Sequence, residues 1–144
     1  MMKVKVLFLC IHNSARSQMA EAFLKKYGST HFEADSAGLE KGKLNPLAIE
    51  VMKEEGIDIS NNQTHDVFDF SKEGRIYHYV ITVCDKEASD RCPIFPGMNE
   101  KINWSFSDPS QFSGTYEEKL AQTRIVRDQI KAAVLDFVRQ KGSR

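Results

Sequence analysis

The chain has 144 residues, of which 41% are hydrophobic and 28% charged, and this composition is typical of one folded domain spanning residues 1–144. A chain of this length buries enough surface to fold without disulfides or a structural metal. Its 20 basic and 20 acidic side chains balance, so no overall charge attracts nucleic acid or an anionic membrane. The longest apolar run, Val6 to Ile11, is far too short to span a bilayer. We therefore expect a cytoplasmic protein that binds neither nucleic acid nor a membrane, and we expect it to be a monomer.

The first half of the chain alternates predicted strands and helices. Residues 4–9 are β-branched, aromatic and almost continuously apolar, which predicts a strand covered on both faces, as in a parallel sheet. Apolar residues recur at helical spacing over residues 17–28, and a shorter strand is predicted over residues 32–35. Asn45 followed by Pro46 is typical of an N-cap and a first helical position, so a second helix is predicted to begin there.

The second half continues the alternation. Residues 77–83 predict another strong strand and residues 102–106 a shorter one. Apolar residues at helical spacing from Tyr116 onward predict a long C-terminal helix. Together these elements predict an α/β fold, in which a single-domain, open, parallel, four-stranded sheet carries helices on both faces.

A polar loop that begins with a cysteine joins the first strand to the first helix. The backbone N–H groups of such a loop, together with the helix N-terminus, can converge on an anion. The helix end and the Arg16 guanidinium are expected to lower the pKa of the Cys10 thiol below its usual value of about 8.5, which makes its thiolate a nucleophile. Arg16 offers a planar fork for a tetrahedral oxyanion, and the Ser17 hydroxyl can donate to the Cys10 sulfur. The alternative is a structural Cys10 with Arg16 paired to a surface acid. The predicted oxyanion-binding loop comprises Ile11, His12, Asn13, Ser14, Ala15 and Arg16.

A second thiol and an aspartate also follow predicted strands. Cys84 and Asp108 come after the ends of two later strands, as Cys10 comes after the first. Ligands of open parallel sheets bind outside the carboxyl ends of the strands, so we expect these groups along one rim. Cys92 follows Cys84 within a polar, proline-containing segment. The alternatives are two incidental buried thiols and an ordinary Ser-Asp-Pro turn at Asp108.

The sequence CIHNSARSQMAE of residues 10–21 resembles the catalytic loop of the low-molecular-weight tyrosine phosphatase fold. Within that fold, it more closely resembles the thioredoxin-coupled arsenate reductases. The likeness extends over nearly the whole chain, through residues 36–38, 45–46, 57–60, 83–85, 92–93 and 107–109.

The resemblance implies that the chain reduces arsenate to arsenite with three thiols. Cys10 attacks arsenate, Cys84 attacks the Cys10 sulfur of the adduct as arsenite leaves, and Cys92 then attacks Cys84. Thioredoxin is the implied reductant of the resulting disulfide, and Asp108 is the implied proton-transfer residue. Disulfides need Cα atoms about 4.4–6.8 Å apart, so we expect oxidation to remodel residues 84–92.

Three positions depart from the family pattern. His12 stands where glycine is often found, and Ala15 stands where a further cysteine is often found. The three relay thiols are still present. Ser110 follows Asp108 and Pro109, where phosphatases of this fold usually have tyrosine. The missing tyrosine and the extra thiols favour arsenate over phosphotyrosine as the substrate.

Some related reductases hold a potassium ion near the catalytic loop. The resemblance implies Asn13, Glu21, Ser36 and Asp66 as its ligands. The alternatives are loop caps for Asn13 and Ser36 and solvated surface charges for the two carboxylates. No tightly bound cofactor is expected.

Three functions are therefore compared. The first is a thioredoxin-coupled arsenate reductase. The second is a phosphatase that hydrolyses phosphomonoesters through a phosphocysteine at Cys10, with the other two cysteines protecting that thiol from overoxidation. The third is a non-catalytic module that binds an oxyanion.

Overall fold

The computed structural model describes residues 3–84 and 90–142, and four strands of this part form one sheet. The strands are β1 (Val4–Cys10), β2 (Phe32–Gly38), β3 (Tyr79–Thr82) and β4 (Glu100–Asn103). Their order is β2-β1-β3-β4, and every neighbouring pair is parallel. The predicted α/β class and the open, parallel, four-stranded sheet are confirmed.

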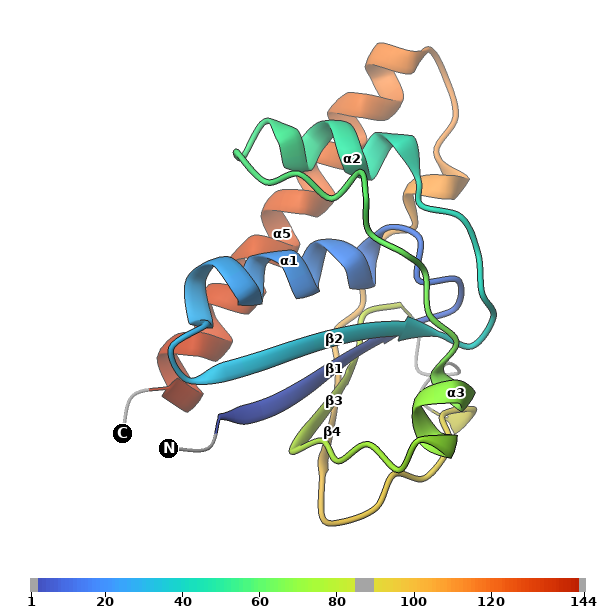
Figure 1. The fold of residues 1–144 in the computed structure, drawn as a ribbon. Coiled ribbons are helices and arrows are strands. Elements are labelled where there is room, and N and C mark those ends of the chain that lie inside the picture. Colours follow the sequence, from blue (N-terminus) through green and yellow to red (C-terminus); the bar gives the residue numbers. More distant parts are fainter. Residues whose placement is uncertain (1–2, 85–89, 143–144) are drawn as a thin grey trace.

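Helices lie on both sides of this sheet (Figure 1). Helices α1, α2 and α5 lie on one side, and the short α3 lies on the other, near the carboxyl ends of the strands (Figure 1). Within residues 3–84 and 90–142, no helix is long and apolar enough to cross a bilayer. The helices are α1 (Arg16–Gly28), α2 (Pro46–Lys53), α3 (Val67–Lys72) and α5 (Tyr116–Gly142), with a 3-10 turn η1 (Pro109–Gln111).

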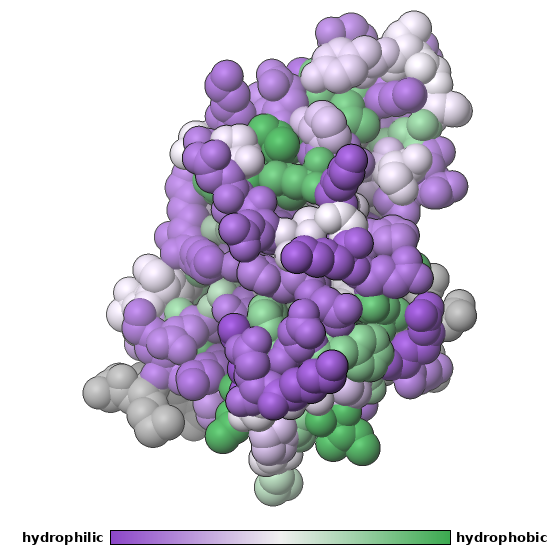
Figure 2. All heavy atoms as spheres, turned by 45° about the vertical axis from the view of Figure 1, so that its right-hand side comes forward, coloured by the Kyte–Doolittle hydropathy of each residue, from purple (hydrophilic) through white to green (hydrophobic). Residues whose placement is uncertain are grey.

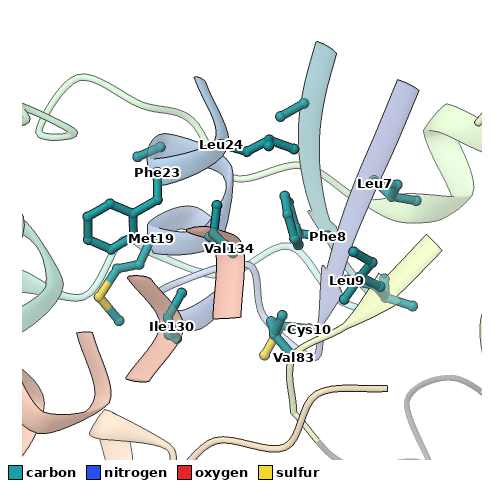
Figure 3. Close-up of a cluster of buried hydrophobic side chains, with 14 of the residues drawn as sticks. Leu7, Phe8, Leu9, Cys10, Met19, Phe23, Leu24, Val83, Ile130 and Val134 are labelled. Atoms are coloured by element: carbon teal, nitrogen blue, oxygen red, sulfur yellow. The ribbon is translucent and has the colours of Figure 1, made fainter. Parts of the chain in front are cut away.

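Strand β1 is the centre of the hydrophobic core. Leu7 and Phe8 are both fully buried although adjacent strand residues point to opposite faces. Phe8 points toward α1 and α5, where it faces Val134, while Leu7 lies on the other side of the strand (Figure 3). Burial on both faces explains why the sequence of this strand is apolar almost without interruption. It also holds the last residue of the strand, Cys10, in a rigid position.

Several strands differ from their predicted bounds: β2 extends to Gly38 rather than ending at residue 35, and β3 is Tyr79–Thr82 rather than residues 77–83. The last strand was expected over residues 102–106 but is Glu100–Asn103. The apolar residues after Asn103 lie beyond the strand and are partly buried by ring packing. The ring centroid of Trp104 lies 6.1 Å from that of Phe8 and 6.0 Å from that of Phe137. Helix α3 was not predicted, because six residues are too few to show a helical repeat.

A network of charged groups joins α2 to α5. Arg127 is 8% exposed; its Nη1 donates to Glu54 Oε1 at 2.7 Å and to the Val51 carbonyl at 3.0 Å. Arg124 binds the same carboxylate at 2.8 Å. These bonds, with the Arg124 bond as the largest cause, lower the pKa of Glu54 below its ordinary value. Of the two arginines, Arg127 is the one that also donates to the buried Val51 carbonyl.

Replacing Arg127 by methionine therefore lowers the free energy of unfolding by about 1–2 kcal/mol, because the Val51 carbonyl loses its donor and the partly exposed Glu54 loses a partner. Urea denaturation measures the loss. Arg124→Met is the matched control and costs less, since Arg124 is at the surface and serves no buried carbonyl. Equal losses in the two variants would show that the buried carbonyl is unimportant.

Candidate active site

The carboxyl edge of the sheet brings two of the three predicted thiols, Cys10 and Cys84, to one place. Cys10 ends β1 and pairs with Gly38, the last residue of β2. Val83, which follows β3, donates its N–H to the Leu9 carbonyl at 3.0 Å and so fixes the start of the next segment. Figure 3 shows Cys10 and Val83 side by side at this edge. Cys84 therefore lies close to Cys10 because the backbones are paired.

Backbone hydrogen bonds and one left-handed residue set the conformation of the loop after β1. Asn13 has a φ of 55°, a left-handed conformation that asparagine tolerates better than most residues. The N–H of Glu40 donates to the Ile11 carbonyl at 2.8 Å, and that of Asn45 donates to the Ser14 carbonyl at 2.8 Å. Ala15 occupies the N-cap of α1 and has no polar side chain to cap the helix. The first N–H groups of α1 therefore face the loop without a side-chain cap, as an anion site requires.

Gly38 makes room for this loop. A Cβ atom at Gly38 would lie 2.7 Å from the Ile11 carbonyl oxygen and 2.8 Å from the Asn13 nitrogen. Both are backbone atoms, so neither can move aside as a flexible side chain could. Any larger residue would displace the oxyanion loop.

Arg16 and Asp108 are neighbours. Arg16 is 8% exposed, and its Nη1 donates to the Phe106 carbonyl at 3.0 Å. Its Nη2 lies 3.4 Å from Asp108 Oδ2. The other carboxylate oxygen, Oδ1, accepts from the N–H and the hydroxyl of Ser110 at 2.9 and 2.8 Å. The fork of Arg16 is thus fixed at the loop, with a carboxyl group at its side.

Cys10 and Cys84 form a buried pair of thiols, 4% and 3% exposed. Their side chains are hydrogen-bonded, and this bond, followed by burial, raises the pKa of the Cys10 thiol well above its ordinary value. Arg16 and the Ile11 N–H act in the opposite direction but are outweighed. The expectation of a lowered pKa was wrong for this state, because the helix end and Arg16 are visible in the sequence whereas the neighbouring thiol and the burial are not.

Cys92 has other neighbours. It is half-buried at the margin of the core, where burial raises its pKa to about 11 and Lys101 on β4 partly offsets the rise. None of the three cysteines is in a disulfide. The expected rearrangement of residues 84–92 falls largely on residues 85–89, which lie outside the described residues, and it stays a prediction.

The sequence and the fold are similar to those of known proteins. Residues 5–140 match the family of low molecular weight phosphotyrosine protein phosphatases. The chain belongs to this family. An arsenate reductase of Halalkalibacterium halodurans is 44% identical over 137 residues, which are 95% of this chain and 96% of that protein. A solved structure of an arsenate reductase in its oxidized state is 34% identical, with a TM-score of 0.79 over 96% of this chain and 98% of the other. A thioredoxin-dependent arsenate reductase of Corynebacterium glutamicum is 27% identical, with a TM-score of 0.63 over 92% of this chain and 62% of that chain.

His12 departs from the phosphatase-family loop without distorting it. The left-handed residue of the loop is Asn13, and His12 is not among the described residues with a positive φ. Its Nδ1 lies 3.6 Å from Glu40 Oε2, and both side chains are more than half exposed. A side chain in place of glycine is therefore accepted here without backbone strain.

The potassium ligands implied by the family resemblance are already engaged with other groups. Asn13 Oδ1 accepts from the His65 N–H at 2.9 Å and from Gln18 at 3.2 Å. The Glu21 carboxylate accepts from the Ser36 hydroxyl and lies 2.6 Å from the Lys25 ammonium. The remaining ligand, the carboxylate of residue 66, caps α3. Among residues 3–84 and 90–142, no three His, Cys, Asp or Glu side chains are grouped to hold a metal.

This arrangement does not fit a potassium ion as it stands, because the Asn13 amide oxygen already accepts from two N–H donors and the Lys25 ammonium places a positive charge beside Glu21. No step of the chemistry is assigned to one. Potassium binding at these residues remains a prediction.

Gln18 is a residue that the sequence did not single out, and it supports the oxyanion loop. Its amide is 1% exposed and donates from Nε2 to the Asn13 carbonyl at 3.1 Å and to the Gln63 carbonyl at 3.0 Å. Asn13 in turn donates to Ser17 Oγ at 2.7 Å. The predicted Ser17 contact with the Cys10 sulfur is untested; the bond that the structure gives Ser17 is with Asn13. A glutamine inside the apolar stripe of α1 was the one signal that could have revealed this network.

Replacing Gln18 by leucine weakens binding of inorganic phosphate to the loop at least tenfold, because Asn13 loses the donor that holds its left-handed backbone. The measurement is protection of Cys10 from iodoacetamide by phosphate. Gln122→Leu is the control, since Gln122 also donates to carbonyls but is only half-buried and lies on α5. Unchanged protection in Gln18→Leu would show that the loop keeps its shape without this support.

Proposed function

We propose that this chain reduces arsenate to arsenite, with Cys10 as the nucleophile, Cys84 and then Cys92 as resolving thiols, and thioredoxin as the reductant. The observation that carries the proposal is the buried, hydrogen-bonded pair of Cys10 and Cys84 thiols beside the oxyanion loop. A phosphatase working through Cys10 needs no second thiol in that position. The arsenate reductase of Halalkalibacterium halodurans, at 44% identity over nearly the whole chain, supports the same activity.

The first step is an attack by Cys10 on arsenic. A sulfur–arsenic bond forms and an arsenic–oxygen bond breaks, and the departing oxygen takes a proton from the carboxyl group of Asp108. Arg16 holds the remaining oxygens with its fork, which its bond to the Phe106 carbonyl already orients. The N–H groups at the start of α1 bind the same oxyanion.

The second step transfers the electrons. The thiolate of Cys84 attacks the Cys10 sulfur, a disulfide forms, and the electron pair of the sulfur–arsenic bond stays on arsenic, which leaves as arsenite. Arsenic gains two electrons and the two sulfurs lose them. The contact already present between these side chains favours this step, because little movement is needed before attack.

The third step regenerates the nucleophile. Cys92 attacks Cys84, Cys10 leaves as a thiolate, and a dithiol then reduces the Cys84–Cys92 disulfide while it becomes a disulfide itself. A thioredoxin-dependent arsenate reductase of Corynebacterium glutamicum, with a TM-score of 0.63, supports thioredoxin as that dithiol. Three cysteines outside any disulfide fit a reducing compartment, and we propose that the protein acts in the cytoplasm as a monomer.

A second candidate is hydrolysis of phosphomonoesters. The ion pair of Arg16 and Asp108 favours it, because a phosphatase also needs an oxyanion clamp beside an acid. In that case Cys84 and Cys92 protect Cys10 from overoxidation. Ser110 in place of a tyrosine argues against phosphotyrosine as the preferred ester.

The deciding experiment follows NADPH oxidation by purified protein, thioredoxin and thioredoxin reductase on addition of arsenate. Sustained, arsenate-dependent oxidation supports the reductase. Hydrolysis of an aryl phosphate by the same preparation, with no arsenate turnover, replaces it by the phosphatase. Failure of both, also with other thiol reductants, leaves an oxyanion-binding module.

A further inference from the structure

The segment between Cys92 and β4 exposes large apolar side chains. Ile94 is 88% exposed and Met98 is 96% exposed, whereas Phe95 between them is 3% exposed and packs edge-on against Tyr77 at 5.2 Å. Ile76, next to Tyr77, is 52% exposed. Apolar side chains gather at the lower end of the face in Figure 2, where Figure 1 places the loop leading into β4. We call Ile76, Ile94 and Met98 the apolar patch.

Two contacts hold the loop that carries Ile94 and Met98 beside the segment of Ile76. A Cβ atom built at Gly97 would lie 3.8 Å from the Ile76 side chain, so the backbone next to Met98 lies close to Ile76. The ring of Phe95, next to Ile94, packs against the ring of Tyr77, next to Ile76. Single exposed apolar residues are ordinary, but several in one place mark a surface that another molecule covers.

The position of the patch along the chain points to what covers it. Phe95 is fixed, and Cys92 precedes it by three residues, so no more than about 10 Å of extended chain separates them. Cys84 is 3% exposed, whereas Cys92 is half-buried, which leaves the Cys92 side as the approach for an outside thiol. A protein that brings a sulfur to the Cys84–Cys92 disulfide must therefore cover the surface beside Cys92.

We propose that the apolar patch is the docking surface for the protein dithiol that reduces the Cys84–Cys92 disulfide. This inference rests on the proposed function. A small charged thiol is too small to bury three apolar side chains, whereas a protein of the thioredoxin type can bury them beside its own cysteines. On the docked complex, one partner thiolate forms a bond to one sulfur of the disulfide and the other sulfur leaves. The second partner thiol then attacks the mixed disulfide, so the partner leaves as a disulfide and both electrons stay on the thiols of Cys84 and Cys92.

The test compares the double variant Ile94→Ser/Met98→Ser with Ile125→Ser, a control on α5 where an isoleucine is 59% exposed. We expect the double variant to raise the KM for thioredoxin at least tenfold and to leave arsenate reduction driven by dithiothreitol unchanged, because dithiothreitol needs no docking surface. The control keeps the wild-type KM. A KM within twofold of wild type in the double variant overturns the proposal.

A binding measurement separates this inference from the proposed function. Oxidised protein is titrated with thioredoxin in which both active cysteines are replaced by serine, so no redox chemistry occurs. A Kd at least tenfold weaker for the double variant than for wild type and control supports docking even if arsenate is not the substrate. Equal values, or no binding by wild type, overturn it. A wild-type dimer that the double variant abolishes in sedimentation overturns it in favour of a second copy of this chain.

Discussion

Replacing Cys84 by serine abolishes arsenite formation and leaves hydrolysis of an aryl phosphate within a few-fold of wild type. Cys84 supplies the sulfur that attacks Cys10 in the reductive step, and serine at that position cannot form the disulfide that accepts the two electrons. Serine retains a hydroxyl that can bond to the Cys10 sulfur, so the buried pair remains polar and satisfied. Arsenite is measured directly, and aryl phosphate hydrolysis is measured on the same preparation.

Cys92→Ser is the matched control for that variant. It leaves the first two steps intact, so one equivalent of arsenite forms and turnover then stops with a Cys10–Cys84 disulfide. Mass spectrometry of the trapped proteins distinguishes the two variants. Repeated arsenate turnover by Cys84→Ser would exclude the three-thiol relay.

Replacing Arg16 by lysine lowers kcat/KM at least a hundredfold, both for arsenate reduction and for aryl phosphate hydrolysis. Lysine keeps the charge but loses the planar fork, and removal of one preorganised donor to an oxyanion typically costs 10²–10³ in rate. It also loses the bond that ties the fork to the Phe106 carbonyl and the contact with Asp108. Steady-state kinetics with both substrates measure the loss.

Arg75→Lys is the control for this prediction. Arg75 also pairs with an aspartate, Asp35, but it lies over the Phe70 ring on the side of α3 and does not contact the oxyanion loop. We expect its activity to stay near wild type. If Arg16→Lys lost less than tenfold in both reactions, the assignment of Arg16 as the oxyanion clamp would be wrong.

Both predictions concern groups that change the pKa of Cys10. In the reduced protein, the hydrogen bond with Cys84 and burial both oppose deprotonation of the Cys10 thiol. Arg16 is the group that favours a thiolate at Cys10. We therefore expect Cys84→Ala to lower the pKa of Cys10, since it removes the largest cause of the rise.

Much of the fold is predictable because it depends on patterns within short segments. The unbroken apolar run of β1 requires burial on both faces, and the Asn45-Pro46 cap begins α2, with the Asn45 side chain accepting from the Leu47 N–H at 2.9 Å. The bounds of the edge strand β4 were predicted wrongly, because Trp104 lies beyond the strand and is partly buried against Phe8 and Phe137, which are distant in sequence. A local pattern cannot separate burial in a sheet from burial beneath a helix.

The sequence by itself determined the parallel sheet, the anion-binding loop and the family resemblance, because each depends on residue types at fixed spacing. Only the tertiary structure decided how the groups meet: Gln18 beneath Asn13, Arg16 against the Phe106 carbonyl, and the thiol of Cys84 against that of Cys10. The Cys10 pKa shows the difference most clearly. Its direction depends on burial and on a neighbour that follows another strand, and both are consequences of chain packing that no local sequence pattern contains.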